Sequence, residues 1–326
     1  MKRINDDFRR QLYADLSIDV PYVRGQNCQV NNCWHFCTDG AAVDAMFCDE
    51  EDFVSGMNRI YVVGKKYWDS VVILAFSLMD THVHFVLYGR YDECNCFIHE
   101  YLRLTSLEIS RRHKVKKNLL NIPVVCQTVD DDFYLRVVIC YVVKNAPVGG
   151  LNFNAYDYPW SSGPLYFRQK DRWSSPAWMN WLDNERNLSG MGTRYKRSLL
   201  KTRDVQIADD AIVFDGMVFP GEYVAYDIVE RIFKTHRGFN FFMCISKDDD
   251  VDQRGGIISR LSIPIYELRQ YRNEISMELF GTSSLKKLSV QQRLKLARAL
   301  RRRYNSSIKQ IIRICGLIYE EAKHQL

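Results

Sequence analysis

The chain has 326 residues, of which 47% are hydrophobic and 13% aromatic, so it is long and apolar enough for two domains with buried cores. Its longest apolar run, around residues 71–79, is too short to span a bilayer, and its opening residues lack the apolar region of a signal peptide. We therefore expect a globular, cytoplasmic protein with no membrane partner, present as a monomer or homodimer.

The charge distribution predicts the class of partner, and the cysteine spacing predicts the state of the thiols. The net charge is +6, but residues 281–326 contain 11 Lys and Arg against two Glu, a net charge of +9, which leaves −3 for the rest. A basic terminal module on a slightly acidic body indicates contact with nucleic acid, although a solvated charged helix face would have the same composition. The ten cysteines form no CxxC pair, so we expect reduced, structural thiols.

The first half of the chain alternates between strand and helix patterns. Residues 1–30 are mixed and polar, as in an extension that packs on the body or stays loose. A first strand is predicted at 33–38 and a helix at 49–61, whose acidic opening turn suits the helix dipole. Residues 70–78 are rich in β-forming residues and lead into a second run at 78–87. We expect these last two segments to pair antiparallel, which would place the histidines on a central sheet.

The second of these runs contains two histidines, His82 and His84, separated by one apolar residue. Side chains alternate faces along a strand, so both imidazoles point one way while Val83, Phe85 and Leu87 point into the opposite layer. Two adjacent imidazoles are half of a metal site, although a histidine in an apolar run is often a hydrogen-bonded core residue.

Further helix and strand patterns follow the histidines. Residues 96–113 have the apolar spacing of an amphipathic helix, and 122–128 read as another strand. The acidic residues 130–132 then form a cap region for a second long helix. One sheet covered by helices is the simplest assembly of these elements.

This second helix contains the predicted nucleophile. It is closed by Pro147 and Gly149, and within it Tyr141 and Asn145 are four residues apart, so they share a helical face. Together with the two histidines they suggest a metal beside a nucleophile. Tyr134 lies seven residues before Tyr141 on roughly the same face but has no ligand four residues later, so Tyr141 is favoured.

The order and spacing of these blocks resemble one known family, the REP-associated tyrosine transposases, within the single-tyrosine HUH transposases, where HUH means His-hydrophobic-His. The resemblance covers roughly residues 30–165, about half of the chain. The blocks that carry it are His82-Val83-His84, Tyr141 with Asn145 and the following Pro147-Val148-x-Gly150-Leu151, and Asp157-Tyr158-Pro159-Trp160-Ser161-Ser162. A weaker opening match is Trp34-His35-Phe36, followed by Phe47-Cys48-Asp49-Glu50-Glu51-Asp52-Phe53.

The resemblance implies an α+β, ferredoxin-like HUH domain with an antiparallel sheet and both of its helices against one face. It implies a transposase that nicks single-stranded hairpin or palindromic DNA and transfers the strand through a 5′-phosphotyrosine on Tyr141. His82, His84 and Asn145 would be the metal ligands. Two imidazoles and one amide leave positions open for phosphate and water, which suits Mg²⁺ or Mn²⁺, whereas a closed zinc site would want a fourth protein ligand.

Two alternatives stay open. A repeat-DNA-binding protein could keep the transposase fold without cutting. A general HUH nuclease resembling replication initiators or relaxases is less favoured, because the HUH strand of those enzymes usually comes after the tyrosine segment or with further tyrosines.

We divide the chain into an HUH domain at 1–170, a linker and middle region at 171–280, and a basic helical module at 281–326. Trp160, at the end of the first, is interpreted as a packing anchor rather than a base-stacking residue. The middle region shows strand-like pieces and a helix near 224–233, but no chemical motif.

The terminal module resembles a helix-turn-helix, with helices predicted at 290–303, 308–315 and 318–325 and a turn at Gly316. We expect it to bind DNA mainly through phosphate contacts. The residues predicted to make them are Arg301, Arg302, Arg303, Lys309 and Arg313.

Overall fold

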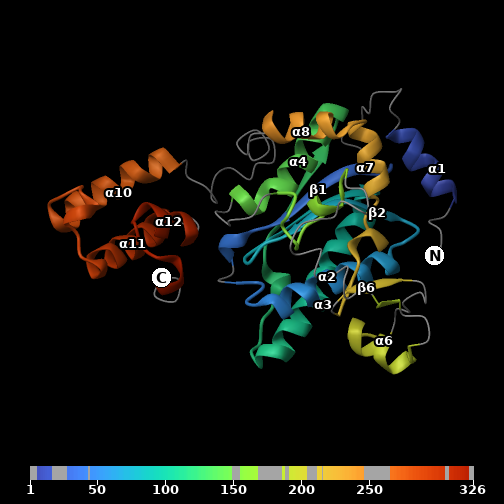
Figure 1. The fold of residues 1–326 in the computed structure, drawn as a ribbon, viewed down its shortest axis with the longest axis horizontal. Coiled ribbons are helices and arrows are strands. Elements are labelled where there is room, and N and C mark those ends of the chain that lie inside the picture. Colours follow the sequence, from blue (N-terminus) through green and yellow to red (C-terminus); the bar gives the residue numbers. More distant parts are fainter. Residues whose placement is uncertain are drawn as a thin grey trace.

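A four-stranded antiparallel sheet lies at the centre of the fold, with the strand order β2-β3-β1-β4 (Figure 1). The computed structural model describes residues 6–16, 28–42, 45–148, 155–167, 186–187, 191–203, 211–214, 216–245, 265–304 and 308–322. The strands are β1 Asn32–Thr38, β2 Val71–Leu78, β3 Val83–Gly89 and β4 Val124–Val129. The α+β class and the antiparallel sheet predicted from the sequence are confirmed.

The hairpin of β2 and β3 carries the histidine motif. As predicted, the two strands pair antiparallel, with Ser77 opposite His84. In the strand order β3 is an inner strand and β2 an edge strand. His82, however, precedes β3 in the connecting turn, which the backbone hydrogen bond from Met79 N to His82 O closes at 2.8 Å. The expectation that one strand contains both histidines was therefore wrong, because Asp80 and Thr81 form bends between the strands.

Helices α2 (Glu50–Lys66) and α3 (Tyr91–His113) cover one face of the sheet. The ring of Phe85 on β3 packs edge-on against Phe97 and Tyr101 of α3, with centroid distances of 5.8 and 5.2 Å. Helix α2 begins where predicted, because the Asp49 side chain accepts a hydrogen bond from Asp52 N. The apolar residues of the histidine strand thus face α3.

Helix α4 (Asp132–Val148) covers the opposite face, together with α8 (His236–Ile245) and α1 (Asp6–Asp15) (Figure 1). Asp131 caps α4 by accepting a hydrogen bond from Tyr134 N at 2.7 Å, which agrees with the acidic cap region predicted at its start. The ring of Phe8 on α1 packs on Tyr88 of β3 at 5.7 Å. Part of the N-terminal extension is therefore a packed helix.

The middle of the chain extends the same hydrophobic core. It comprises β5 Arg186–Asn187, α6 Thr193–Leu200, β6 Ile212–Phe214, β7 Met217–Val218 and α7 Tyr226–Phe233. Val224 bridges Ile73 of β2, and Val218 N donates to Asn58 Oδ1 of α2 at 2.9 Å. Since Val229 and Phe239 also lie in this core, the described part of residues 191–245 packs as one unit with the sheet, across the boundary drawn at 170.

Three helices near the end of the chain surround a second hydrophobic core: α10 Ile265–Phe280, α11 Val290–Tyr304 and α12 Ile308–Ile314 (Figure 1). The short helix α13 Tyr319–Ala322 packs against α12. Leu268 of α10 packs with Leu296 of α11 and Ile311 of α12, so the packed group begins before residue 281. Gly316 makes the predicted turn with a φ of +64°.

The remaining short elements are the 3-10 helices Gly40–Ala42, Leu119–Asn121, Gly163–Leu165, Pro220–Glu222 and Leu285–Lys287. All ten cysteines lie in described segments, and each is a free thiol. Across the described part of the chain, no helix is long and apolar enough to cross a membrane.

Candidate active site

A row of buried polar side chains crosses the sheet on the face covered by α4. His35 on β1 lies directly opposite Gln127 on β4, and His84 on β3 lies diagonally from His35, whose own partner on that strand is Val86. His35, His84 and Gln127 are 1%, 3% and 5% exposed. Three neighbouring strands therefore place imidazoles and an amide under α4.

His82, His84 and Asn145, the residues predicted as metal ligands, meet at one end of this row. His82 Nε2 lies 3.2 Å from Asn145 Oδ1, and Asn145 Nδ2 lies 3.0 Å from His84 Nε2. The two imidazole rings are 4.9 Å apart at an interplanar angle of 81°. The amide of α4 thus lies between the Nε2 atoms of both histidines.

Tyr141 lies one helical turn before Asn145 and packs on the same histidine. Its ring meets those of His84 and His35 edge-on, with centroid distances of 5.5 and 5.7 Å, and it is 8% exposed. The spacing of four residues on α4 therefore brings the predicted nucleophile and the predicted ligand to the same histidine.

Tyr134, the competing tyrosine, is engaged in the sheet. Its hydroxyl donates a hydrogen bond to Gln127 Oε1 at 2.9 Å, and the side chain is 4% exposed. This buried contact with β4 lies at the far end of the row from Asn145. Of the two tyrosines, Tyr141 is the one that packs on His84.

The imidazoles of the row are held in their neutral form. Burial lowers the pKa of His35 to about 4, although the hydrogen bond with Gln127 opposes the shift. Burial also lowers the pKa of His84 well below its usual value, and charge on His82 or His35 would lower it further. At neutral pH, the lone pairs of His84 and His35 are therefore available to accept a hydrogen bond or bind a cation.

The converging donors fit a divalent cation. His82 Nε2, His84 Nε2 and Asn145 Oδ1 are three possible ligand atoms gathered around one amide group. In the structure His82 Nε2 donates a hydrogen bond to Asn145 Oδ1, so it would give up that proton on binding an ion. Three protein donors leave the other coordination positions of an ion open, as in catalytic rather than structural sites. Because imidazole nitrogen binds several first-row metals, these ligand types do not select one ion.

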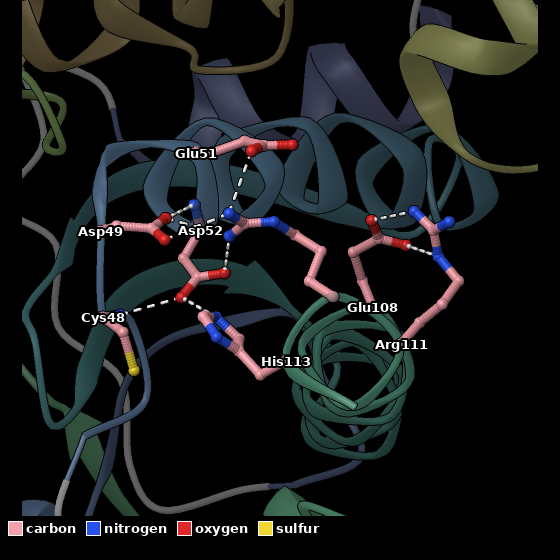
Figure 2. Close-up of polar contacts among 8 residues, drawn as sticks. Cys48, Asp49, Glu51, Asp52, Glu108, Arg111 and His113 are labelled. Atoms are coloured by element: carbon pink, nitrogen blue, oxygen red, sulfur yellow. Dashed lines mark hydrogen bonds and ion pairs between the residues drawn. The ribbon is translucent and has the colours of Figure 1, made fainter. Parts of the chain in front are cut away.

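A second cluster joins the start of α2 to the end of α3 (Figure 2). The Asp52 carboxylate is fully buried; it accepts a hydrogen bond from Cys48 N at 2.9 Å, lies 2.8 Å from His113 Nε2 and forms an ion pair with Arg112. Donor atoms of Cys48, Asp52 and His113 lie within 4.8 Å of one another, a spacing that a metal ion could use. Because Arg112 and His113 already bind the Asp52 oxygens, the cluster acts as an ion-pair junction between the helices.

The contributions of His35 and Gln127 were missed in the sequence, although His35 lies in one of the blocks of the family resemblance. The available signal was the alternation of β1, in which His35 has Trp34 and Phe36 as neighbours on the other face. Those two rings pack on Tyr91 at the start of α3. Which residue lies opposite His35 depends on the strand register, which the sequence did not specify.

The predicted phosphate-binding residues lie on α11, on α12 and in the segment between them. Arg313 is exposed and Arg301 is half-buried. The side chains of Arg302, Arg303 and Lys309 lie outside the described residues. Trp160, in contrast, is a packing residue as predicted, because its ring stacks on Phe53 at 5.2 Å.

Comparison with protein-family models, with curated proteins and with solved structures found no match to this chain. Its function therefore has to follow from the geometry of the site.

Proposed function

We propose that this chain is a metal-dependent, single-strand DNA nickase and strand transferase of the REP-associated tyrosine transposase type, built on a ferredoxin-like HUH domain. The observation that carries the proposal is the convergence of His82, His84 and Asn145 beside Tyr141. Support for the domain comes from the element order β1-α2-β2-β3-α3-β4 and the strand order β2-β3-β1-β4.

His82, His84 and Asn145 would hold Mg²⁺ or Mn²⁺. When bound, such an ion would neutralise charge on the phosphate oxygens during displacement. The protein's part is to fix three ligand atoms from three segments: the β2-β3 turn and β3 supply the imidazoles, and α4 supplies the amide. Thr81 Oγ1, 3.0 Å from His82 Nδ1, orients the more exposed of the two rings.

Tyr141 would attack the phosphate. Its phenol oxygen forms a bond to the 5′ phosphorus, the bond from phosphorus to the 3′ oxygen breaks, and that oxygen takes up a proton while the phenol loses one. The product is a 5′-phosphotyrosine and a free 3′-OH, so the linkage can be passed to another 3′-OH. The phenol must lose its proton as the new bond to phosphorus forms, so Tyr141 needs a proton acceptor as it attacks.

The helices α10 to α13 would bind DNA, with the sugar-phosphate backbone as the main contact. Support comes from the +9 charge of residues 281–326 and from the turn at Gly316 between two helices. Some basic residues of these helices hold the module together: Arg293 donates to Leu285 O at 2.7 Å and to Gly316 O at 3.2 Å, and Arg272 donates to Ile314 O at 2.9 Å.

The test is cleavage of a labelled hairpin oligonucleotide by the purified full chain. Changing His82 or His84 to Ala should reduce cleavage at least 100-fold, roughly the loss of 3 kcal/mol of transition-state stabilisation, while hairpin affinity stays within about threefold. EDTA should have the same effect on the wild type.

Two outcomes would count against this function. Cleavage at the wild-type rate by either variant in EDTA would remove the metal from the mechanism. Tight hairpin binding without cleavage under any metal condition would instead identify a repeat-binding protein that keeps the fold.

A further inference from the structure

We propose that His35 is a positioning residue that fixes the tautomer of His84, so that the Nε2 lone pair of His84 points toward Asn145. The proposal rests on the proposed function, because an oriented lone pair matters most if His84 binds a metal. His35 is not one of the three proposed metal ligands: it lies on β1, and its hydrogen bonds in the structure join it to Gln127 and His84.

The donor and acceptor of each hydrogen bond in this row can be assigned beginning from Gln127. Its Oε1 lies 2.9 Å from the Tyr134 hydroxyl and 3.3 Å from His35 Nδ1. An amide oxygen can only accept, so both neighbours must donate to it. His35 therefore carries a proton on Nδ1.

The next step is the contact between the histidines, in which His35 Nε2 lies 3.1 Å from His84 Nδ1. One of these nitrogens donates and the other accepts. A proton on His35 Nε2 would make His35 an imidazolium, which at 1% exposure, with an amide and an imidazole as its polar contacts among the described residues, would be strongly disfavoured. His35 Nε2 therefore accepts, and His84 Nδ1 donates.

A neutral imidazole with its proton on Nδ1 has its lone pair on Nε2. In His84, that nitrogen lies 3.0 Å from Asn145 Nδ2, on the side where the ligands converge. Metal-binding histidines usually donate their other ring N–H to an acceptor that fixes tautomer and orientation. Here the acceptor is His35, whose ring lies nearly parallel to that of His84, with the centroids 5.4 Å apart and an interplanar angle of 14°.

The first measurement uses the wild-type protein. Long-range proton–nitrogen NMR of the metal-free chain, labelled at histidine nitrogen, reports which ring nitrogen of His84 carries the proton, and His84→Ala identifies its signals. We expect the proton on Nδ1. A proton on Nε2 would overturn the proposal without any variant of His35.

The second measurement compares two substitutions. His35→Phe keeps a flat ring but cannot accept a hydrogen bond, whereas His35→Gln places an amide oxygen near the former Nε2. Titration with Mn²⁺, followed by electron paramagnetic resonance, should give an affinity about 10- to 100-fold weaker for His35→Phe and within about threefold of wild type for His35→Gln. In His35→Phe, the His84 signals should also show a mixture of tautomers.

These results separate the two proposals. If the tautomer and the Mn²⁺ affinity change as expected but the wild type cuts no DNA, His35 positions His84 and the proposed function fails. If the wild type cuts DNA but a folded His35→Phe protein keeps both the tautomer and the affinity, His35 is only a core residue. If His35→Phe does not fold, the position of the His84 proton in the wild-type protein, measured by NMR, still tests whether His35 fixes the tautomer.

Discussion

Asp52 illustrates how much of this fold depends on single buried polar side chains. Its carboxylate is fully buried, yet it contacts Arg112 and His113 from α3 and the backbone N–H of Cys48 (Figure 2). Arg112 also pairs with Asp49 and Glu51, so the junction links the opening turn of α2 to the last turn of α3. Its loss would leave Arg112 with the more exposed carboxylates of Asp49 and Glu51 as its ion-pair partners.

Asp52→Asn should therefore lower the free energy of unfolding by about 1–3 kcal/mol, because a buried hydrogen-bonded charge is removed while its partners stay. Urea denaturation of the full chain measures the change. Glu51→Gln is the matched control: its side chain is 70% exposed and also pairs with Arg112, so its loss should cost less than about 1 kcal/mol. Equal effects of both changes would show that burial at Asp52 is unimportant.

At the scale of the residue, spacing was the informative part of the sequence. The four-residue period placed Tyr141 with Asn145, because it depends only on local helix geometry. His82 and His84 do converge on Asn145, but His82 does so from the turn before β3 rather than through the alternation of one strand. His35 was beyond this reasoning. Its contact with His84 joins positions 49 residues apart and depends on the register of β1 against β3.

At the scale of the element, the turn at Gly316 is the clearest case of a residue required by the backbone. Its φ of +64° falls in the left-handed region, where a side chain costs about 1–2 kcal/mol. Space is not the limit, since the nearest atom to an added Cβ would be 3.5 Å away. The cost of a substitution here is therefore conformational.

Gly316→Ala should accelerate hydrogen exchange in α11 and α12 roughly 5- to 30-fold, because their local stability falls by about 1–2 kcal/mol. Gly64→Ala is the control, and it should change local helix stability in the opposite direction. Gly64 lies within α2, where an added Cβ would meet Ile73 at an ordinary 3.6 Å, so alanine should stabilise that helix. Slower exchange after Gly316→Ala would contradict the assigned turn.

Most elements of the first half were predictable because their apolar periods are regular. The start of α4 was signalled by the acidic cap, and that of α2 by its acidic first turn. Helix α1 was missed, although Phe8, Leu12 and Leu16 recur every four residues and are all buried. The residues between them are mostly polar, so the segment was interpreted as an extension rather than as a helix.

At the scale of the whole molecule, packing divides the described chain into two large hydrophobic cores and one small cluster of Met79 and Tyr158. The sheet recruits residues as distant as Val224, which bridges Ile73, and Phe239, which packs on Phe167 of the segment after Trp160. Such long-range partners leave no local mark in a sequence, so composition alone suggested a linker there. Helix α10 likewise belongs by its packing to the terminal helices.

The basic charge of the terminal helices leads to a prediction about how hairpin binding depends on salt. Replacing Arg301, Arg302, Arg303, Lys309 and Arg313 with Gln should weaken hairpin binding and flatten its dependence on salt, because each lost phosphate contact lowers the slope of log K against log salt by about one unit. Replacing Lys114 and Lys116, which are exposed just beyond α3, serves as the control and should leave the slope unchanged. A slope unaffected by the first set would assign that charge to a solvated face.

The measurement that tests the central claim most directly is the search for a covalent protein–DNA adduct. Denaturing gels of the full chain with hairpins labelled at either end should reveal an adduct on the 5′ side of the cut, because the attacking group is a phenol rather than water. Tyr141→Phe removes only the hydroxyl and should abolish adduct and cleavage while keeping hairpin binding. Tyr134→Phe, on the same helix, should still form the adduct. An adduct formed by Tyr141→Phe, or cleavage by the wild type without any adduct, would contradict the assignment of Tyr141 as the nucleophile.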